Sequence, residues 1–167
     1  MKKCVLYPGS FDPITKGHME IIDQALDLFD WVVIGVLNNS QKKESMFNLM
    51  KRYDMLCELY HNIYKGKNIV ISAADENQTA VQLALEEECS AIVRGVRNIR
   101  DFDYELEMQQ TNRELSDNKI KTVCLFPSQE NLFVSSSKVK EIFYHGGDIS
   151  RYVDPYVEAE MKKIMKR

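Results

Sequence analysis

The chain has 167 residues, of which 44% are hydrophobic and 28% are charged, and its formal net charge is −3 at pH 7. This length favours a single domain over residues 1–167, with a core that buries most of its apolar surface. The negative charge gives no bulk attraction to nucleic acid or to an anionic membrane, so neither is an expected partner.

The sequence also argues against a membrane span, a disulfide framework and a protein-built metal site. No apolar run approaches the roughly 20 residues of a membrane helix, and the first one is too short for a signal peptide. The cysteines are scattered without a CxxC pair, at Cys4, Cys57, Cys89 and Cys124. The histidines lack ligand spacing, at His18, His61 and His145. We therefore expect a cytoplasmic protein whose thiols are structural or incidental.

Five short apolar runs predict strands. They are rich in Val, Ile and Leu and are continuous rather than alternating, as in parallel strands that are buried on both faces. The runs are Cys4–Tyr7, Trp31–Leu37, Ile69–Ile71, Ala91–Val93 and Val123–Phe126.

Helical spacing between these runs predicts the remaining elements. Apolar stripes begin at Met19, Leu49 and Val81, a less clean one covers Phe102–Leu115, and a terminal helix begins after Asp154. The alternation predicts an α/β fold, a doubly wound Rossmann-like domain with about five parallel strands and a C-terminal helix. Ligands of such folds bind at the carboxyl ends of the strands, near a switch in strand order.

The segment after the first run, YPGSFDPITKGH over residues 7–18, leads into a helix that should begin around Gly17 or His18. A helix N-terminus presents unpaired N–H groups and a partial positive charge, so an anion can bind there. His18 would face that anion, with the hydroxyls of Ser10 and Thr15 nearby. The simpler alternative is a turn and a surface histidine, but their position at a strand end favours a site. The segment is neither a Walker A loop nor a GxGxxG fingerprint.

Three arginines follow the fourth run, at Arg94, Arg97 and Arg100. A guanidinium matches phosphate oxygens with two parallel hydrogen bonds. Arg94 directly follows the buried run, so we interpret it as a ligand-binding residue. For Arg100 we favour a solvated position that pairs with a nearby carboxylate such as Asp101 or Glu105.

A run of serines follows the fifth strand, and the apolar positions after it predict a helix that starts within Ser135–Ser137. Serine hydroxyls and helix N–H groups together form a phosphate-sized nest. Ordinary N-capping is the alternative, but a cap needs only one serine. Lys42, after the second run, either extends a basic rim or is simply solvated.

These pieces together resemble the nucleotidyltransferase superfamily, with its (T/H)xGH motif at Thr15–His18 and its serine-rich motif at Val134–Lys140. Four further segments resemble bacterial phosphopantetheine adenylyltransferases: Tyr7–Pro13, Arg94–Arg97, Asp101–Glu105 and Asn112-Arg113. The resemblance runs from the first strand to the terminal helix.

The resemblance implies transfer of AMP from ATP to 4′-phosphopantetheine, which gives dephospho-coenzyme A and pyrophosphate. It implies that ATP is bound by Ser10, Phe11, His18, Gly95, Val96, Arg97, Glu105, Asn131, Leu132, Phe133, Val134, Ser135, Ser136 and Ser137. The acceptor would be bound by Ser10, Lys42 and Arg94, with Ala80 near its pantetheine arm. His18, Lys42 and Arg94 would be catalytic.

The resemblance further implies Mg²⁺ carried on the ATP phosphates, coenzyme A or dephospho-coenzyme A as product or inhibitor, and a homo-oligomer, typically a hexamer. The segment from Asn77 to Ala84 departs from the apolar stretch that the family often has there. Alternatives are a nicotinate mononucleotide adenylyltransferase, a cytidylyltransferase, a class I aminoacyl-tRNA synthetase fragment, or a nucleotide-binding module without catalysis.

Overall fold

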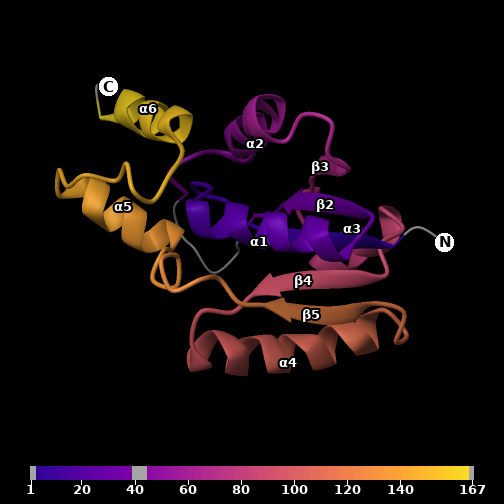
Figure 1. Cartoon of the computed structure of the whole chain (residues 1–167). Helices are drawn as coiled ribbons and strands as arrows, with labels where there is room; N and C mark the ends of the chain where they lie inside the picture. The colour runs from indigo at the N-terminus through magenta and orange to yellow at the C-terminus, as the bar shows by residue number, and fades with distance from the viewer. Residues whose placement is uncertain (1–2, 39–44, 166–167) are drawn as a thin grey trace.

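A computed structural model describes residues 3–38 and 45–165, and Figure 1 shows their arrangement. One parallel sheet has the strand order β3-β2-β1-β4-β5. Its strands are β1 (Cys4–Gly9), β2 (Trp31–Val36), β3 (Ile69–Ala73), β4 (Ala91–Gly95) and β5 (Lys121–Leu125). The strand order reverses between β1 and β4, because β2 and β3 lie to one side of β1 and the later strands lie to the other. This arrangement confirms the predicted doubly wound fold.

Six helices connect or follow the strands. They are α1 (Lys16–Leu28), α2 (Leu49–Ile63), α3 (Ala80–Glu86), α4 (Ile99–Leu115), α5 (Ser136–Tyr144) and α6 (Pro155–Ile164). Thr79 and Gln82 form a capping box at the start of α3, and Asp154 caps α6 just before Pro155. None of the described helices is long and apolar enough to cross a membrane.

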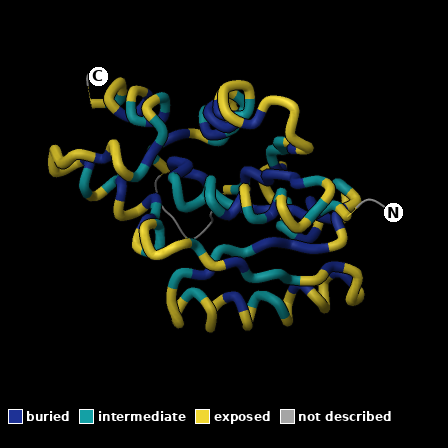
Figure 2. Tube along the Cα trace, viewed as in Figure 1, coloured by how far each residue is buried: buried dark blue, intermediate teal, exposed yellow. Residues whose placement is uncertain are grey.

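The core lies on both faces of the sheet, and Figure 2 shows the buried strands at the centre. The larger cluster packs residues of α1, α2, α5 and α6 against one face, including Ile22, Leu56 and Val157. The smaller cluster packs α3 against the other face through Val81 and Ala84. The continuous apolar runs correctly predicted strands that are buried on both faces, because each central strand contributes side chains to both clusters.

The ends of the strands differ from the predicted runs where the site lies. β1 continues through Pro8 and Gly9, which stay paired with β2, whereas its register with β4 covers Val5 and Leu6. The adjacent strands β1 and β4 therefore separate toward their carboxyl ends. A ligand crevice is expected at such a point.

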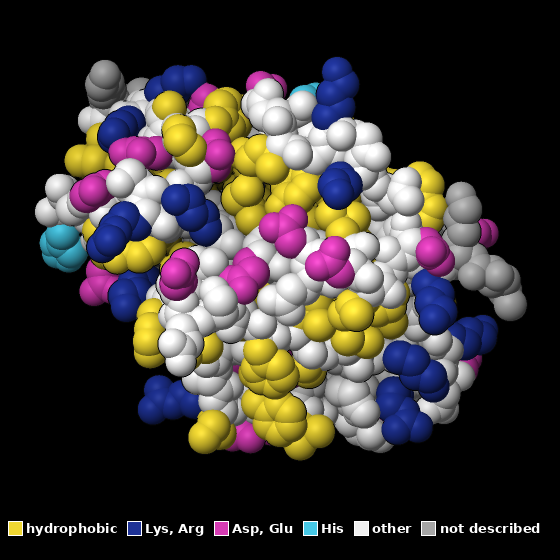
Figure 3. Space-filling view, in the orientation of Figure 1, with side chains coloured by type: hydrophobic (Ala, Val, Ile, Leu, Met, Phe, Trp, Pro, Cys, Tyr) yellow, Lys and Arg dark blue, Asp and Glu magenta, His cyan; other side chains and the backbone are white. Residues whose placement is uncertain are grey.

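Helix α4 is the least buried of the long helices. The residues that it buries are Glu105 and Asn112, both polar. Its exposed side includes Ile99, Leu106 and Leu115, and Figure 3 shows hydrophobic side chains gathered over this helix at the lower edge of the view. This distribution explains why the apolar stripe of the helix was hard to find in the sequence.

Candidate active site

Two adjoining cavities open at the carboxyl ends of β1 and β4. The first, of about 380 Å³, lies between these strand ends and the N-termini of α1 and α5. The second, of about 520 Å³, extends toward α3 and the buried side of α4. They share one wall, made of Pro8, Gly9, Ser10, Arg94, Tyr104 and Glu105. Ser10 and Arg94 therefore face both cavities.

Arg94 is held at the shared wall by a two-point ion pair. Its Nε lies 2.7 Å from Glu105 Oε2, and its Nη2 lies 2.7 Å from Glu105 Oε1. Its Nη1 donates to the carbonyl of Pro8 at 3.3 Å. Burial alone would lower the pKa of Arg94, but the hydrogen bonds and charge of Glu105 outweigh it and raise that pKa. Arg94 is thus a fixed cation at the junction of the cavities.

His18 completes a capping box at the start of α1, which begins at Lys16, slightly earlier than predicted. The Thr15 hydroxyl caps the His18 backbone N–H, and the Thr15 N–H donates to His18 Nδ1 at 3.0 Å. A nitrogen that accepts this bond carries no proton, so the neutral imidazole carries its proton on Nε2. The ring lines the first cavity. The capping box therefore fixes both the orientation and the tautomer of His18.

Two aromatic rings lie beneath the imidazole. The Phe11 ring meets His18 edge to face with centroids 5.2 Å apart, and Tyr7 meets Phe11 in the same way at 5.5 Å. Phe11 has a positive φ of 46°, and its ring lies against Gly9, where an added Cβ would stand 2.9 Å from it. Burial raises the pKa of Tyr7, and the charges of Arg94 and Arg97 oppose that rise. The floor of the site is therefore apolar and tightly packed.

The N-terminus of α5 forms the opposite wall of the first cavity. The Ser135 side chain caps the helix through the Lys138 N–H at 3.2 Å. Ser136 is buried and donates to the Pro13 carbonyl at 2.8 Å, which ties α5 to the loop after β1. Ser137 lines the cavity beside them. Two of the three serines thus have structural roles in addition to lining the cavity.

The loop before α5 is fastened to α1 by Glu20. This carboxylate accepts hydrogen bonds from the Ser128 N–H at 2.7 Å and from Asn131 Nδ2 at 2.8 Å. Gly17 lies against the same loop, where a Cβ would make an ordinary contact with the Val134 carbonyl at 3.4 Å. The helix N-terminus and the loop therefore form one continuous wall.

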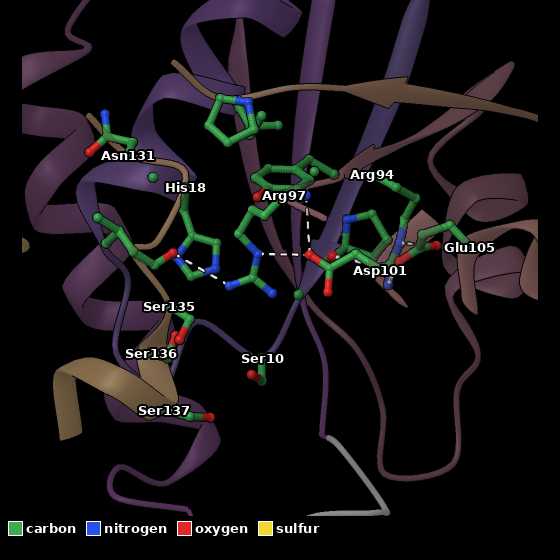
Figure 4. Close-up of a pocket in the computed structure, with 18 of the residues that line it drawn as sticks. Ser10, His18, Arg94, Arg97, Asp101, Glu105, Asn131, Ser135, Ser136 and Ser137 are labelled. Carbon is green, nitrogen blue, oxygen red and sulfur yellow. Dashed lines mark hydrogen bonds and ion pairs between the residues drawn. The ribbon is translucent and has the colours of Figure 1, made fainter. Parts of the chain in front are cut away.

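Arg97 spans the first cavity from the other side. Its Nε pairs with Asp101 at 2.9 Å, and its Nη1 donates to the Val134 carbonyl at 3.4 Å. Figure 4 shows Arg97 between His18 and Asp101, with the serines of α5 and Ser10 facing the same opening. Asp101 and Glu105 therefore pair with Arg97 and Arg94. Arg100 is exposed, as predicted, and lines the first cavity, but the carboxylates of Asp101 and Glu105 pair with the other two arginines rather than with Arg100.

Most residues predicted to bind ATP or the acceptor come together here. The first cavity is lined by Ser10, His18, Arg94, Gly95, Arg97, Glu105, Asn131, Val134, Ser135, Ser136 and Ser137. Ala80 lines the second cavity with Ser10 and Arg94. Lys42 lies outside the described residues. The predicted roles of all these residues in binding stay predictions.

Four of the predicted ATP-binding residues are not among the side chains that line the described cavities. Phe11 and Val96 are each 1% exposed and belong to the core. Leu132 and Phe133 precede Val134 in the loop before α5, and Phe133 is 72% exposed. A contact from these four would have to come from the backbone or from a side chain that moves.

Other residues of the site received no role from the sequence, although Tyr104 and Asn112 stand in two of the segments that carry the resemblance. Tyr104, Met108 and Asn112 line the second cavity from α4, and Glu20 positions the loop across the first. Their spacing of four residues along α4 was a usable signal, because residues at i, i+4 and i+8 share one helix face. Glu20 gave no such signal, since its partners are more than 100 residues away.

Comparison with known proteins identifies the family of this chain. Residues 6–142 match the cytidylyltransferase-like family. Phosphopantetheine adenylyltransferase of Nautilia profundicola is 40% identical over 148 residues, which cover 89% of this chain and 92% of that protein. Its counterpart in Thermodesulfovibrio yellowstonii is 38% identical over the full length of both chains. The chain belongs to the phosphopantetheine adenylyltransferase family.

The fold is shared more widely than this family. Nicotinic acid mononucleotide adenylyltransferase of Plasmodium falciparum, solved in complex with NaAD, superposes with a TM-score of 0.72 at 18% identity, covering 99% of this chain and 96% of that one. At that identity the likeness concerns the fold alone. Membership of the phosphopantetheine adenylyltransferase family rests on the sequence relatives.

Proposed function

We propose that this chain transfers the adenylyl group of ATP to 4′-phosphopantetheine, giving dephospho-coenzyme A and pyrophosphate. The observation that carries the proposal is the pair of cavities that share a wall at Ser10 and Arg94. A transfer between two bound substrates needs two compartments whose reacting ends meet at one place. The family membership of the chain gives the identity of the two substrates.

ATP fits the first cavity. Two helix N-termini, at α1 and α5, face it with partial positive charge, and Arg97 lies across it. Such a surround suits a triphosphate rather than an apolar ligand. The acceptor fits the second cavity, with its phosphate at Ser10 and Arg94 and its arm running toward Ala80 and Asn112. Dephospho-coenzyme A and coenzyme A share that arm and would compete for the same cavity.

The reaction needs alignment more than acid–base chemistry. A phosphate is already a nucleophile at neutral pH, so its oxygen can attack the α-phosphorus of ATP in line as pyrophosphate leaves. Arg94, fixed by Glu105, would hold the attacking phosphate. His18, with its proton on Nε2, would donate to an oxygen that gains charge during transfer. Lys42 would add a second cation for the same purpose.

Magnesium is proposed to enter on the ATP phosphates. The two carboxylates that line the first cavity, Asp101 and Glu105, already bind Arg97 and Arg94. Among the residues that the structure describes, no group of three His, Cys, Asp or Glu side chains could hold a metal ion. Phosphate oxygens are the hard ligands that Mg²⁺ prefers. The ion would offset the negative charge that builds up on the departing pyrophosphate.

A homo-oligomer, a hexamer in this family, is part of the proposal. The exposed apolar residues of α4 support it, because contiguous apolar surface commonly marks a protein interface. Sedimentation of the chain beside a Leu106→Lys variant tests this point. A smaller assembly is expected for the variant if α4 forms a contact between subunits. The cytoplasmic location stays a prediction.

A coupled pyrophosphate assay tests the proposed reaction. The chain is incubated with ATP and Mg²⁺, and the acceptor is 4′-phosphopantetheine, nicotinate mononucleotide or none. Release of pyrophosphate only with 4′-phosphopantetheine is the expected result. Release with nicotinate mononucleotide would identify a different transferase, and ATP binding without release would identify a non-catalytic module. A parallel reaction with CTP and phosphocholine tests a cytidylyltransferase.

A further inference from the structure

Arg52 is an arginine buried inside the apolar face of α2. It is 1% exposed and is among the largest fully buried side chains of the chain. Met55, Leu56 and Leu59 lie on the same face of the helix and belong to the core. A charged group is rarely placed there, because its desolvation is costly unless every donor is satisfied. The position therefore calls for a specific role.

The guanidinium binds four acceptors on three separate stretches of chain. Its Nη1 donates to the Ser10 carbonyl at 2.6 Å and to the Leu37 carbonyl at 2.9 Å. Its Nη2 donates to Asn38 Oδ1 at 2.7 Å, and its Nε donates to the Phe47 carbonyl at 3.1 Å. Ser10, Leu37 and Asn38 all line the second cavity. Arg52 therefore holds three residues of that cavity's wall from behind.

Within residues 3–38 and 45–165, the four acceptors of Arg52 are all neutral oxygens, so no hydrogen-bonded carboxylate there cancels its positive charge. The charge of Asp12 acts on Arg52, but Asp12 is 1% exposed and is paired with Lys140 at 2.8 Å. Asp12 also accepts the N–H groups of Met46 and Phe47. The charges of Asp12 and Lys140 offset each other, whereas the positive charge of Arg52 lies at the Ser10 carbonyl, in the wall of the second cavity. In a partly dehydrated site such a charge attracts an anion more strongly than it would in water.

We propose that Arg52 is a positioning residue for the acceptor phosphate: it fixes the Ser10 backbone and the adjoining wall, and it adds positive charge behind that phosphate. The inference rests on the proposed function, which places the phosphate of the acceptor at Ser10 and Arg94. Arg52 itself touches no substrate. It acts through the residues whose carbonyls it holds.

The test compares Arg52→Lys and Arg52→Gln with Lys51→Met as a control. Lysine keeps the positive charge but cannot reproduce the hydrogen bonds of the planar guanidinium. Glutamine keeps a polar side chain but loses the charge. Lys51 is the neighbouring residue on α2, pairs with Glu160 and lines neither cavity, so its loss leaves the site intact. Each folded variant is titrated calorimetrically with 4′-phosphopantetheine and with pantetheine, which lacks the phosphate.

We expect Arg52→Gln to raise the Kd for 4′-phosphopantetheine about tenfold or more, since hydrogen bonds to a charged group are lost with the charge itself. Arg52→Lys should raise it less, and the Kd for pantetheine should change less than twofold in both variants. The same order should appear in KM for the acceptor, with kcat lowered by poorer alignment. Lys51→Met should match the parent chain.

Three results would overturn the inference. One is a parent-like Kd for 4′-phosphopantetheine in both folded Arg52 variants. Another is an equal loss of affinity for pantetheine, which would mark a general disturbance of the wall. The third applies if Arg52→Gln does not fold: a parent-like Kd for 4′-phosphopantetheine in Arg52→Lys alone would then overturn the inference. A parent chain that releases no pyrophosphate with 4′-phosphopantetheine would instead refute the proposed function, so the two failures are distinguishable.

Discussion

The two ends of the same strands are joined to their neighbours in different ways. At the amino end, main-chain bonds link one strand start to the next: Trp31 N–H to the Lys3 carbonyl, Ser90 N–H to the Cys4 carbonyl, and Lys121 N–H to the Ser90 carbonyl. At the carboxyl end, main-chain bonds also join β1 to β2, β2 to β3 and β4 to β5, but β1 and β4 are bridged there by a side chain, from Arg94 to the Pro8 carbonyl. Both cavities open at this point between β1 and β4.

The difference shows why the site is at one end of the sheet. At the amino end, the Ser90 N–H donates to the Cys4 carbonyl at 3.0 Å and keeps β4 beside β1. The register of β1 with β4 covers only Val5 and Leu6, and at the carboxyl end the N-termini of α1 and α5 face the gap between these two strands. The side chains of His18, Arg94 and Arg97 line the first cavity at the carboxyl end, whereas the thiols of Cys4 and Cys89 lie together at the amino end. Mutations at the two ends should therefore have very different consequences.

The largest effect is expected from His18→Ala. Loss of a donor to the charge that develops during transfer should lower kcat about 10²–10³-fold, with a much smaller change in KM for ATP. Steady-state kinetics of the folded variant measure both quantities. A large rise in KM at unchanged kcat would mean that His18 only binds ATP in the ground state.

His18→Gln separates the two roles of this residue. Alanine also removes the acceptor of the Thr15 N–H, which weakens the start of α1 by about 1 kcal/mol. Glutamine at the same position can restore that bond, since Thr-x-x-Gln is a capping box. We expect the glutamine variant to recover the melting temperature without recovering kcat. Full recovery of kcat would assign the loss in His18→Ala to the cap.

Arg94→Lys should have the second largest effect. A lysine cannot make the two-point ion pair with Glu105, so its cation would be held less firmly at the shared wall than the Arg94 guanidinium is. We expect KM for 4′-phosphopantetheine to rise about tenfold, with a smaller change in the Kd of ATP. Arg113→Lys is the matched control, because Arg113 is on the same α4 as Glu105 but is exposed and binds Asn118. An equal rise in KM for 4′-phosphopantetheine in both variants would contradict the assignment of Arg94 to the acceptor site.

The strands and the general position of the site could be predicted, because both depend on local patterns. Continuous Val and Ile runs predict parallel strands, and parallel strands predict ligands at their carboxyl ends. The pairing of Arg94 with Glu105 depends instead on how α4 returns to β4. In the sequence Arg100 was an equally good neighbour for that carboxylate. The fold decides between the two arginines, because it brings Glu105 within 2.7 Å of Arg94.

Arg52 and Phe11 show what the sequence left open. Arg52 carries a signal that was not used, a cation three, four and seven residues before Met55, Leu56 and Leu59 on an apolar face. Its acceptors, however, come from loops that no local pattern brings together. Phe11 has a positive φ, which is uncommon for a bulky residue, and its ring packs between the Tyr7 and His18 rings, which no local sequence pattern indicates.

Substitutions at the amino end should leave catalysis almost unchanged. Cys4 and Cys89 lie with their sulfurs 2.9 Å apart in the smaller core cluster, and burial raises the pKa of both thiols. We expect Cys4→Ala and Cys89→Ala to keep kcat and both KM values within about twofold of the parent, because chemistry at phosphorus needs no thiol. A loss of kcat in a folded Cys4 variant would contradict the division between the two ends.

The smallest effect is expected at a pair that joins helices but lines neither cavity. Glu160 on α6 binds Lys51 of α2 at 2.8 Å and Lys163 at 2.6 Å, and hydrogen bonds from Lys163 and then Lys51 lower its pKa from 4.5. A lowered pKa in the folded state means that the stabilisation is complete above pH 4.5 and is lost as the pH falls through the folded value. Glu160→Gln should therefore lower the melting temperature by about 2–4 °C at pH 7, for a pair worth up to about 1 kcal/mol, and leave kcat unchanged. The difference in melting temperature should shrink on acidification below pH 4.5.

A difference in melting temperature that grows below pH 4.5 would show that the carboxylate is destabilising in the folded chain. A fall in kcat at pH 7 would extend the functional region beyond the two cavities.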